Sequence, residues 1–482
     1  MKTLIAIGIL TGALTGCSLA PTYQQPFMPI PDHFKETGKW VPAKVKAKAP
    51  IDPPGPWWLI FNDQTLNELE ARVVPANQDL KAAFARYQEA SALVEVARAG
   101  LFPNSEALFN ASRQKTSVTV ANPSSIPINN NVLVGANLNY ELDVWGRIRN
   151  TVLQSKGLAK ASEADLAAAT LSLHAQLASN YFSLRGADEA QRILDTTVVA
   201  YQKALYLTQK RHQGGAAPIA DVDEAHTQLE IAKTLAADMR LQRAQLEHAI
   251  AVLIGKFPAD FSLPPAKLPK QTVKLNPDLP STLLERRPDI AAAELRVQAA
   301  NANIGIARAA FFPDFNLSGV IGFQSQTVTN LLSKPSLFWS LGPISALSLV
   351  QPTAAQVLFD GGKLLGLLRQ ANASYFETVA NYRQTVLTAF QEVEDNLVAI
   401  KRLAQENRSQ TAATLYAKRA LIQAQHRYTG GIITFLEVVV VENTALQTEL
   451  SAVNIRTRQQ IASVQLIKAL GGGWVIAPPP RI

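Results

Sequence analysis

The chain has 482 residues, a formal net charge of +8 and a single cysteine, Cys17. One cysteine excludes a disulfide within the chain, and because the positive charge is not gathered into a patch with interleaved aromatic residues, we do not expect nucleic-acid binding. Charged residues make up only 17% of the sequence, which predicts helices that bury small side chains against neighbours along much of their length.

The first segment is typical of a signal peptide. Lys2 precedes an apolar run, residues 4–14, and the run ends in Leu14-Thr15-Gly16-Cys17. These four residues resemble the lipobox of bacterial lipoproteins, in which the cysteine becomes the lipidated first residue of the mature chain. We therefore predict a signal peptide over 1–16 and a covalent lipid such as palmitate on Cys17, the alternative being a cysteine that merely ends an apolar segment. Ser18 follows in place of Asp, which by the same resemblance implies delivery to the outer membrane.

Residues 17–65 are rich in Pro, Lys and Trp and are interpreted as an extended tether that packs on the outside of something larger. A helical pattern follows from about residue 66 to 101, with an interruption near Pro75, and Phe102-Pro103 ends it. No window of the mature chain offers the roughly 18 uncharged apolar residues that a membrane helix needs, so a membrane span would have to consist of strands.

Two pairs of strands are predicted, at about 104–143 and at about 314–359. In the first pair, Val132, Val134, Ala136, Leu138, Tyr140 and Leu142 alternate with residues that are small or polar apart from Leu133. In the second, Phe315, Leu317, Gly319, Ile321 and Phe323 alternate with residues that are small or polar apart from Val320. A period of two gives each strand one apolar face.

Long helical hairpins follow each pair. Outgoing runs from residue 147 to about 212 and from 364 to about 428 hold no proline, which at 1.5 Å per residue gives helices about 100 Å long. Each ends in a similar tip, Arg211-His212-Gln213-Gly214-Gly215 or Arg427-Tyr428-Thr429-Gly430-Gly431, and a glycine pair after a basic turn is typical of a helix C-terminus.

The two halves are a tandem duplication. Ala97-Arg98-Ala99 matches Ala307-Arg308-Ala309, and Gly255 matches Gly471. Repeat 1 is expected over 66–255 and repeat 2 over 289–471, with a proline-rich linker at 256–288 and a tail at 472–482. Repeats this long predict two large modules within one interleaved architecture.

Four half-apolar strands cannot close a barrel by themselves, and open edges in lipid leave backbone groups unpaired. The chain is therefore expected to assemble with copies of itself. Two copies would give eight strands with a filled interior, and three would give twelve strands with room for a lumen. The pattern of residues does not choose between them.

Several motifs resemble the outer-membrane efflux factors of the TolC family, in particular its OprM/NodT-type lipoprotein branch. They are Leu284-Glu285-Arg286-Arg287-Pro288-Asp289-Ile290, Glu141-Leu142-Asp143-Val144-Trp145-Gly146-Arg147, Phe359-Asp360-Gly361-Gly362-Lys363, the two tips and the lipobox. The resemblance implies a mainly α-helical homotrimer with a twelve-stranded β-barrel in the outer membrane and a twelve-helix periplasmic α-barrel. It also implies an equatorial collar made by the terminal regions and the linker.

The same resemblance implies roles for the tips. Gly214, Gly215, Gly430 and Gly431 would receive the hairpin tips of a periplasmic adaptor, a membrane fusion protein, besides ending their helices. Leu436, Val440 and Asn443 share a helix face and match the family's periplasmic gate, where the family has Leu, Asp and Arg. We therefore expect an apolar gate, the alternative being that Val440 packs between helices. Nearby carboxylates should make the mouth attract cations; they are Asp221, Asp223, Glu224, Glu437 and Glu442.

The function predicted from this resemblance is a passive outer-membrane exit duct for drugs or other small toxic molecules, supplied by an adaptor and an inner-membrane RND-type pump. Alternatives are an export duct of a type I protein secretion system and a periplasmic scaffold lipoprotein that forms no channel. No metal-ligand spacing, cofactor motif or catalytic constellation accompanies the six histidines or the paired carboxylates, so we expect neither a metal nor an enzyme.

Overall fold

The computed structural model describes residues 18–37, 56–117, 119, 128–269, 286–341 and 354–472. Most of these residues are helical, which confirms the prediction of a mainly α-helical chain. The helices are α2 (Gln64–Ala76), α3 (Gln78–Ala99), α4 (Arg147–Gln213), α5 (Ile219–Leu253), α7 (Pro288–Ala309), α8 (Lys363–Thr429) and α9 (Phe435–Ala469). Short 3-10 turns are η1 (Lys35–Thr37), η2 (Trp57–Phe61), η3 (Pro258–Asp260) and η4 (Lys334–Ser336). None of the described helices is long and apolar enough to cross a membrane.

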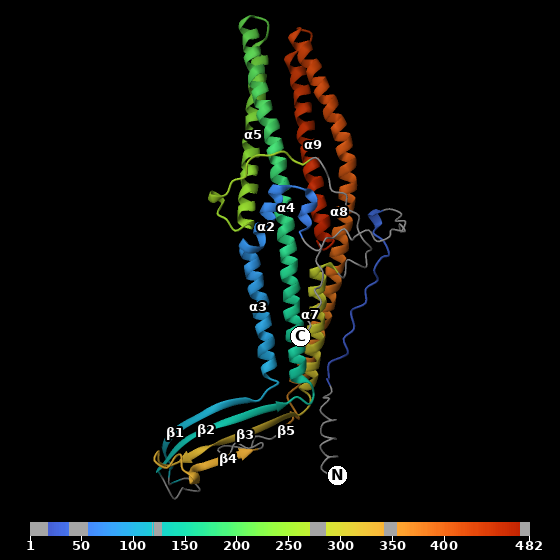
Figure 1. Cartoon of the computed structure of the whole chain (residues 1–482). Helices are drawn as coiled ribbons and strands as arrows, with labels where there is room; N and C mark the ends of the chain where they lie inside the picture. Colours follow the sequence, from blue (N-terminus) through green and yellow to red (C-terminus); the bar gives the residue numbers. More distant parts are fainter. Residues whose placement is uncertain are drawn as a thin grey trace. The chain divides into compact units, whose positions relative to one another are not determined.

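The chain divides into two compact units, and neither unit is a repeat. The first contains residues up to Phe27, Ala85–Glu163 and Ala292–Arg383, and the second contains Met28–Phe84, Ala164–Ala291 and the chain from Gln384 onward. Each unit therefore draws segments from both halves of the duplication, as expected for interleaved modules. The four longest helices, α4, α5, α8 and α9, form two helical hairpins (Figure 1).

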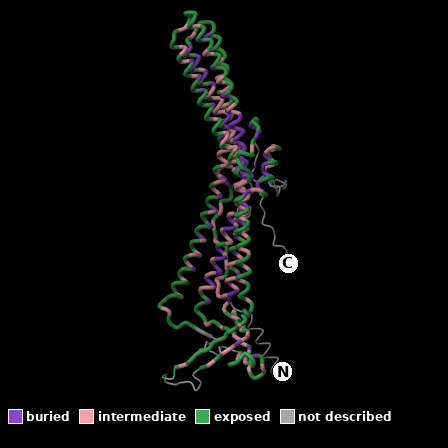
Figure 2. Tube along the Cα trace, turned by 90° about the vertical axis from the view of Figure 1, so that its left-hand side faces the viewer, coloured by how far each residue is buried: buried purple, intermediate pink, exposed green. Residues whose placement is uncertain are grey.

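The first unit holds one antiparallel sheet in the order β1-β2-β3-β4, and β5 also pairs with β3 (Figure 1). Its strands are β1 (Asn104–Lys115), β2 (Ile128–Leu142), β3 (Asp314–Ser325), β4 (Leu337–Leu341) and β5 (Ala354–Ala355). The second strand of the second predicted pair is therefore described in two pieces, β4 and β5. Residues 342–353, between them, lie outside the described part of the chain. Most of the sheet is exposed in the single chain (Figure 2).

The strand register gives this sheet one continuous apolar face. Val134 lies opposite Phe109 on one side and Phe323 on the other, while Ile321 lies between Ala136 and Trp339. Phe109, Ile321 and Trp339 are solvent-exposed in the single chain, Trp339 by 71%, while Val134 and Phe323 are partly buried. The other face is mixed: Asn139 pairs with Ser318 and the Gln324 side chain donates to Asn131 Oδ1 at 2.9 Å, but Leu133 and Phe338 also lie on it. The predicted alternation is therefore carried across neighbouring strands, because antiparallel partners share a face.

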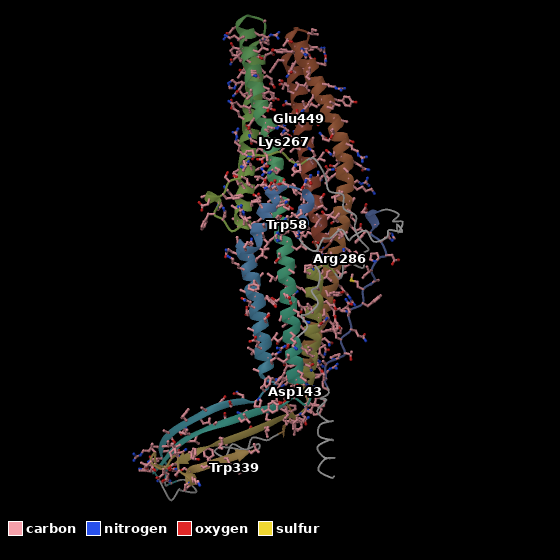
Figure 3. The ribbon with its side chains drawn as sticks, in the orientation of Figure 1. Trp58, Asp143, Lys267, Arg286, Trp339 and Glu449 are labelled. Carbon is pink, nitrogen blue, oxygen red and sulfur yellow. The ribbon has the colours of Figure 1, made fainter. Side chains whose placement is uncertain are left out.

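Both junctions from strand to helix use an aspartate and glycines of positive φ. Asp143 accepts hydrogen bonds from the main-chain N–H groups of Ile148 and Arg149, each at 2.9 Å, and so caps α4 (Figure 3). At the matching place, Asp360 accepts from the N–H groups of Gly362 and Leu364. Gly146, Gly361 and Gly362 have φ of 75°, 66° and 92°, which other residues adopt only with strain. The glycines in these motifs thus permit the turn.

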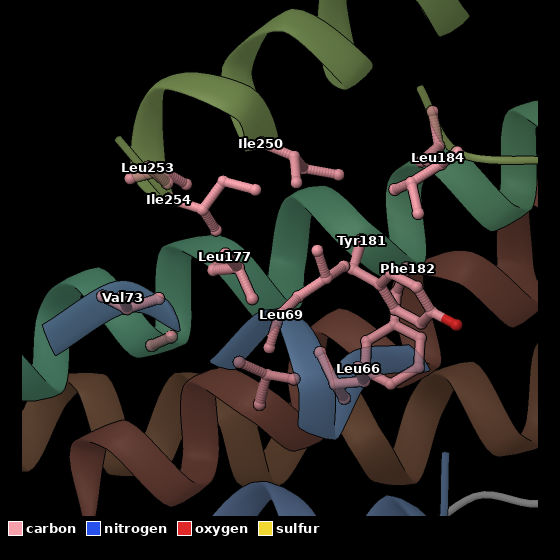
Figure 4. Packing of buried hydrophobic residues seen from close by; sticks show 14 of the residues in the cluster. Leu66, Leu69, Val73, Leu177, Tyr181, Phe182, Leu184, Ile250, Leu253 and Ile254 are labelled. Atoms are coloured by element: carbon pink, nitrogen blue, oxygen red, sulfur yellow. The ribbon is translucent and has the colours of Figure 1, made fainter. Parts of the chain in front are cut away.

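The second unit contains the largest apolar core. Leu66, Leu69 and Val73 of α2 pack against Leu177, Tyr181 and Phe182 of α4 and against Ile250, Leu253 and Ile254 at the end of α5 (Figure 4). The helical stretch of α2 ends at Ala76, immediately after Pro75, and Asn77 separates it from α3. The Asn77 side chain donates to Leu253 O, at the end of α5, at 2.9 Å and accepts from Leu80 N–H, in the first turn of α3, at 3.1 Å. It thus supplies a hydrogen-bond partner to a main-chain group at each of these helix ends.

Candidate functional site at the hairpin tips

Each hairpin tip ends its outgoing helix in the same way. Gly215 N–H donates to His212 O and Ala216 N–H to Arg211 O, and Gly431 and Ile432 repeat the pattern with Tyr428 O and Arg427 O. These paired bonds form a Schellman motif, whose C′ residue is left-handed. Gly215 has φ +74° and Gly431 has φ +73°, whereas Gly214 and Gly430 do not have positive φ. Only the second glycine of each pair is therefore required by the backbone.

The surfaces of these second glycines are open. A Cβ atom on Gly215 or Gly431 would meet nothing within 4 Å, and one on Gly214 would meet only main-chain oxygens at 3.5 and 3.7 Å. Space next to the glycines is what a docking partner would need. Adaptor docking at these glycines stays a prediction.

Arg211 joins the two tips within one chain. It donates to Tyr428 O at 3.0 Å, and its guanidinium carbon lies 4.5 Å from the centre of the Tyr428 ring. Tyr428 packs in turn against Phe435 at 5.5 Å, in a small buried cluster with Val438, Val439 and Ala225. Sequence reasoning missed this contact. The sequence feature that could have indicated this contact is a difference between the tips: the first has His212 where the second has Tyr428.

The predicted gate residues occupy the exposed side of the first turns of α9. Leu436 and Val440 are 61% and 59% exposed in the single chain, and Asn443 is exposed as well. Phe435, Val438 and Val439 point to the opposite, buried side. Within its own chain, Val440 is thus not packed between helices, and the three gate residues share one face as the spacing predicted.

The predicted tip carboxylates do not form one group. Asp223 and Glu437 are exposed, Asp221 and Glu224 are partly buried, and Glu224 accepts from the Gln228 side chain at 2.9 Å. The Glu437 side chain accepts from Thr434 N–H at 3.3 Å and helps to begin α9.

Glu442 corrects the sequence-based expectation. It is buried on the packed face of α9, with Gln425 donating to its Oε1 at 3.4 Å, and burial raises the pKa of its carboxyl above the usual value. A carboxyl in this position does not add to the charge of an exposed mouth, because burial disfavours its charged form. The helical spacing alone did not reveal this, since Glu442 lies one position from the exposed Asn443.

Two histidines lie near the tips, His212 at the first and His426 at the second. The His212 Nδ1 atom lies 2.9 Å from Ala217 O across the tip, while His426 and His226 are exposed. Among the residues that the structure describes, no group of three or more His, Cys, Asp or Glu is arranged to hold a metal ion. Cys17, the predicted lipid attachment site, lies outside the described residues.

Comparisons with known proteins agree with one another. A family model described as outer membrane efflux protein matches residues 72–256 and 279–472. Outer membrane protein OprJ of Pseudomonas aeruginosa is 32% identical, over 98% of this chain and 97% of that protein. The toluene efflux pump outer membrane protein TtgC of Pseudomonas putida is 30% identical, with 98% and 96% covered. The crystal structure of the Campylobacter jejuni CmeC outer membrane channel has a TM-score of 0.85 at 26% identity and covers 96% of each chain.

Proposed function

The chain belongs to the outer membrane efflux protein family, so it is an outer-membrane efflux component and not an enzyme, and from this premise we propose that it is the channel subunit of a tripartite pump. It would act as a passive exit duct, supplied by a periplasmic adaptor and an inner-membrane RND-type pump. The observation that carries the proposal is the sheet with one exposed apolar face, joined to hairpins whose outgoing helices have 67 residues each. A helix of that length spans about 100 Å, which suits a conduit across a wide compartment.

We propose that three chains assemble around the conduit. Phe109, Ile321 and Trp339 would face lipid, while the Asn139 face would line the interior. A sheet that leaves its outer strands unpaired must find partners before it can reside in lipid, since unpaired backbone groups are costly there. Three copies would make a closed barrel wide enough for a lumen, with the helices continuing it as a twelve-helix periplasmic barrel.

Aromatic residues at the end of the sheet support a membrane boundary there. The Trp145 indole packs against Phe312 with the ring centres 4.7 Å apart and donates to Pro313 O at 2.9 Å, and Phe102, the counterpart of Phe312 in the first repeat, is 68% exposed. Tryptophan and other aromatic rings are enriched at the interface between lipid and water. In the proposed arrangement, these residues mark the periplasmic face of the outer membrane.

We further propose that Cys17 carries the lipid anchor. Ser18, the next residue, is held against α4 because its hydroxyl donates to Asn150 Oδ1 at 3.0 Å, so the anchored end would begin beside the proposed membrane boundary. Mass spectrometry of the mature N-terminus tests this. An acylated cysteine as the first residue is expected, and an unmodified residue other than Cys17 would contradict the assignment.

The transported molecules are proposed to be drugs or other small toxic compounds. The relatives support this class by name, because one of them belongs to a toluene efflux pump. The decisive experiment is complementation of a strain that lacks its own outer-membrane efflux channel. Restored efflux of a fluorescent cationic dye, together with discrete conductance steps of the purified protein in planar bilayers, is the expected result. Conductance without restored efflux would point to a different export system.

Adaptor docking at the tips has its own test. Gly214→Trp together with Gly430→Trp should preserve the assembled protein, since neither glycine has positive φ and the added Cβ atoms would have no neighbour closer than 3.4 Å, but should abolish efflux by filling the docking surface. Lys401→Trp, on the exposed surface of α8 away from the tips, is the control. Undiminished efflux in the double variant would exclude docking at these glycines.

A further inference from the structure

The two hairpins of one chain meet along a closely packed seam. A Cβ atom on Gly186 of α4 would lie 2.3 Å from Oγ1 and 3.2 Å from Cβ of Thr457 in α9, so a larger residue at this position would displace Thr457. Nearer the tips, Ala190 and Ile193 of α4 are buried in one cluster with Val453 of α9. We call these contacts between α4 and α9, all within the second unit, the internal seam.

The duplication repeats both surfaces of the internal seam elsewhere on the chain, and there they are exposed. α8 has 67 residues like α4, and α5 has 35 residues like α9. When the helices are aligned from their first residues, Arg402 of α8 matches Gly186, and Leu241 of α5 matches Thr457. Both matching residues are exposed, Leu241 by 56%. In the view of Figure 1, α5 and α8 are the outermost of the four long helices.

The next turn of each helix shows the same difference. Ala190 and Val453 are buried in the internal seam, whereas their matching residues, Glu406 and Ala237, are exposed. Glu406 has a partner in its own chain, since Arg458 lies 3.7 Å away. The chain thus presents on α8 and on α5 the two halves of a seam whose other occurrence is closed inside the chain. A second copy of the chain carries the complement of each half.

Hydrogen-bonding groups match at the core end of these surfaces. In the internal seam, the Gln465 side chain donates to Ser179 Oγ at 3.1 Å. The matching residues are Ala249 of α5, which follows His248, and Asp395 of α8. His248 and Asp395 are both exposed. An imidazole N–H can donate to a carboxylate, so this pair can replace the hydrogen bond of the internal seam.

Charges are complementary nearer the tips. Arg402 is an exposed cation where the internal seam has Gly186, and its guanidinium donates to Gln405 Oε1 at 3.1 Å. Asp238, one helical turn from Leu241 on α5, is an exposed anion. The long arginine side chain on α8 can therefore reach Asp238 of a second copy. An arginine in place of glycine also holds the two helices farther apart than α4 and α9 are in the internal seam.

We propose that α5 of one copy packs against α8 of the next copy in the register of the internal seam, with Arg402 beside Asp238 of the neighbouring copy. The inference rests on the proposed function, because it names the surfaces that join the proposed three chains. Two different surfaces meet in this contact, so it is head-to-tail, and such contacts generate a closed ring when the rotation closes. Seams within chains and seams between chains then alternate around the helical barrel.

The test is disulfide crosslinking of the full-length assembly in outer membranes. The Cβ separation of 3.2 Å at Gly186 and Thr457 is close to the roughly 3.5–4.5 Å of a disulfide. Arg402→Cys with Leu241→Cys should therefore link neighbouring copies on mild oxidation. Denaturing electrophoresis without reductant should show products of two and of three chains, and dithiothreitol should return both to single chains.

Lys401→Cys with Leu241→Cys is the matched control. Lys401 is exposed and adjoins Arg402, but it points about 100° away around the helix, so this pair should give at least about fivefold less crosslinked product. Each cysteine variant alone controls for Cys17. Coexpression of Arg402→Cys and Leu241→Cys on separate chains restricts the link to different copies and should give products of two chains.

Three results would overturn the proposal: equal crosslinking of the test and control pairs, no crosslinking of the test pair, or a linked product with the mass of one chain. A second pair, Ser409→Cys with Ala237→Cys, corresponds to the buried cluster of the internal seam and removes no charged residue. Its crosslinking decides between the outcomes if loss of Arg402 prevents assembly.

Native mass spectrometry and bilayer conductance of the unmodified protein distinguish failure of this contact from failure of the channel assignment. A conducting trimer in which neither cysteine pair crosslinks overturns the contact between α5 and α8 alone. A monomer without conductance argues against the channel and removes the contact with it.

Discussion

Asn77 and Arg287 bind main-chain carbonyls at corresponding places in the two repeats. Asn77, before α3, donates to Leu253 O near the end of α5 at 2.9 Å, and Arg287, before α7, donates to Ala469 O near the end of α9 at 3.1 Å. Both are buried. The duplication has therefore kept the contact and changed the side chain that makes it, and the longer arginine reaches two carboxylates as well.

Replacement of Arg287 should be costly. Its guanidinium binds both oxygens of Asp289, at 3.0 and 2.7 Å, and Glu392 at 2.7 Å. Arg287→Ala should lower the free energy of unfolding by about 2–4 kcal/mol, since it leaves a buried carbonyl and two carboxylates without their partner. Arg287→Lys should recover only part of this, because a single ammonium cannot span all three groups. Chemical denaturation followed by circular dichroism measures both; equal losses would contradict the account.

The two glycines of each tip should respond differently to substitution by alanine. Gly215→Ala should destabilise the tip by about 1–2 kcal/mol, because its φ of +74° is left-handed, whereas Gly214→Ala should cost little. Gly431→Ala and Gly430→Ala repeat the comparison in the second hairpin. Hydrogen exchange of the tip amides is the measurement. Similar exchange in the two members of a pair would show that the backbone conformation does not select the glycine.

The sheet predicts a difference between neighbouring positions. Leu138→Arg places a charge on the apolar face and should reduce stability in a bilayer by roughly 2–4 kcal/mol near the midplane, whereas Asn139→Arg, on the mixed face, should be tolerated. The yield of assembled protein extracted from outer membranes reports the effect. Equal tolerance at both positions would contradict the assignment of faces.

An apolar gate should respond to polarity and not to salt. Leu436→Ser with Val440→Ser should raise single-channel conductance, because water enters a polar constriction more readily, and Ile432→Ser, an exposed tip residue outside the predicted ring, is the control. Conductance of the unmodified protein, normalised for bulk conductivity, should change little up to 1 M salt, where the Debye length is about 3 Å. Opening on addition of salt would show that charged groups hold the gate closed.

The pair Glu70 and His174 gives the protein a pH-dependent stability. The Glu70 carboxyl lies 2.6 Å from His174 Nδ1, and the Trp58 ring stacks on the imidazole at 4.4 Å. Burial raises the pKa of Glu70 to about 9 and lowers the pKa of His174 to about 4. Both groups are therefore neutral in the folded protein near pH 7.

The sign of the effect follows from proton binding. Above pH 6.5 the unfolded chain has lost both protons while the folded chain keeps that of Glu70, so stability should fall as pH rises from about 6.5 to 9. Between about pH 4.5 and 6.5 the contributions of Glu70 and His174 have opposite signs and largely cancel. Glu70→Gln should remove the decline above pH 6.5. Denaturation midpoints measured across this range test it, and an unchanged slope in the variant would exclude Glu70 as its source.

The features that the sequence predicted depend on neighbours close along the chain. Strand alternation, the glycine tips and the break near Pro75 are local patterns, and the exposed face of Leu436 and Val440 follows from helical spacing. Three other features depend on helices more than a hundred residues away or on a second hairpin. They are the burial of Glu442, the contact of Arg211 with Tyr428 and the carbonyl contact of Arg287. No periodicity within one helix contains that information, although alignment of the repeats places Arg287 beside Asn77.

The apolar clusters along the hairpins of the second unit are much smaller than its main core. The cluster around Phe182 and Leu66 has eighteen buried residues, that of Tyr201, Leu229 and Ala232 has three, and the tip cluster with Tyr428 and Phe435 has five. Local opening should therefore cost less free energy in the stretch between tip and core than at either end. Because each chain's two tips share a buried cluster of their own, a partner that grips them would act on a packed end.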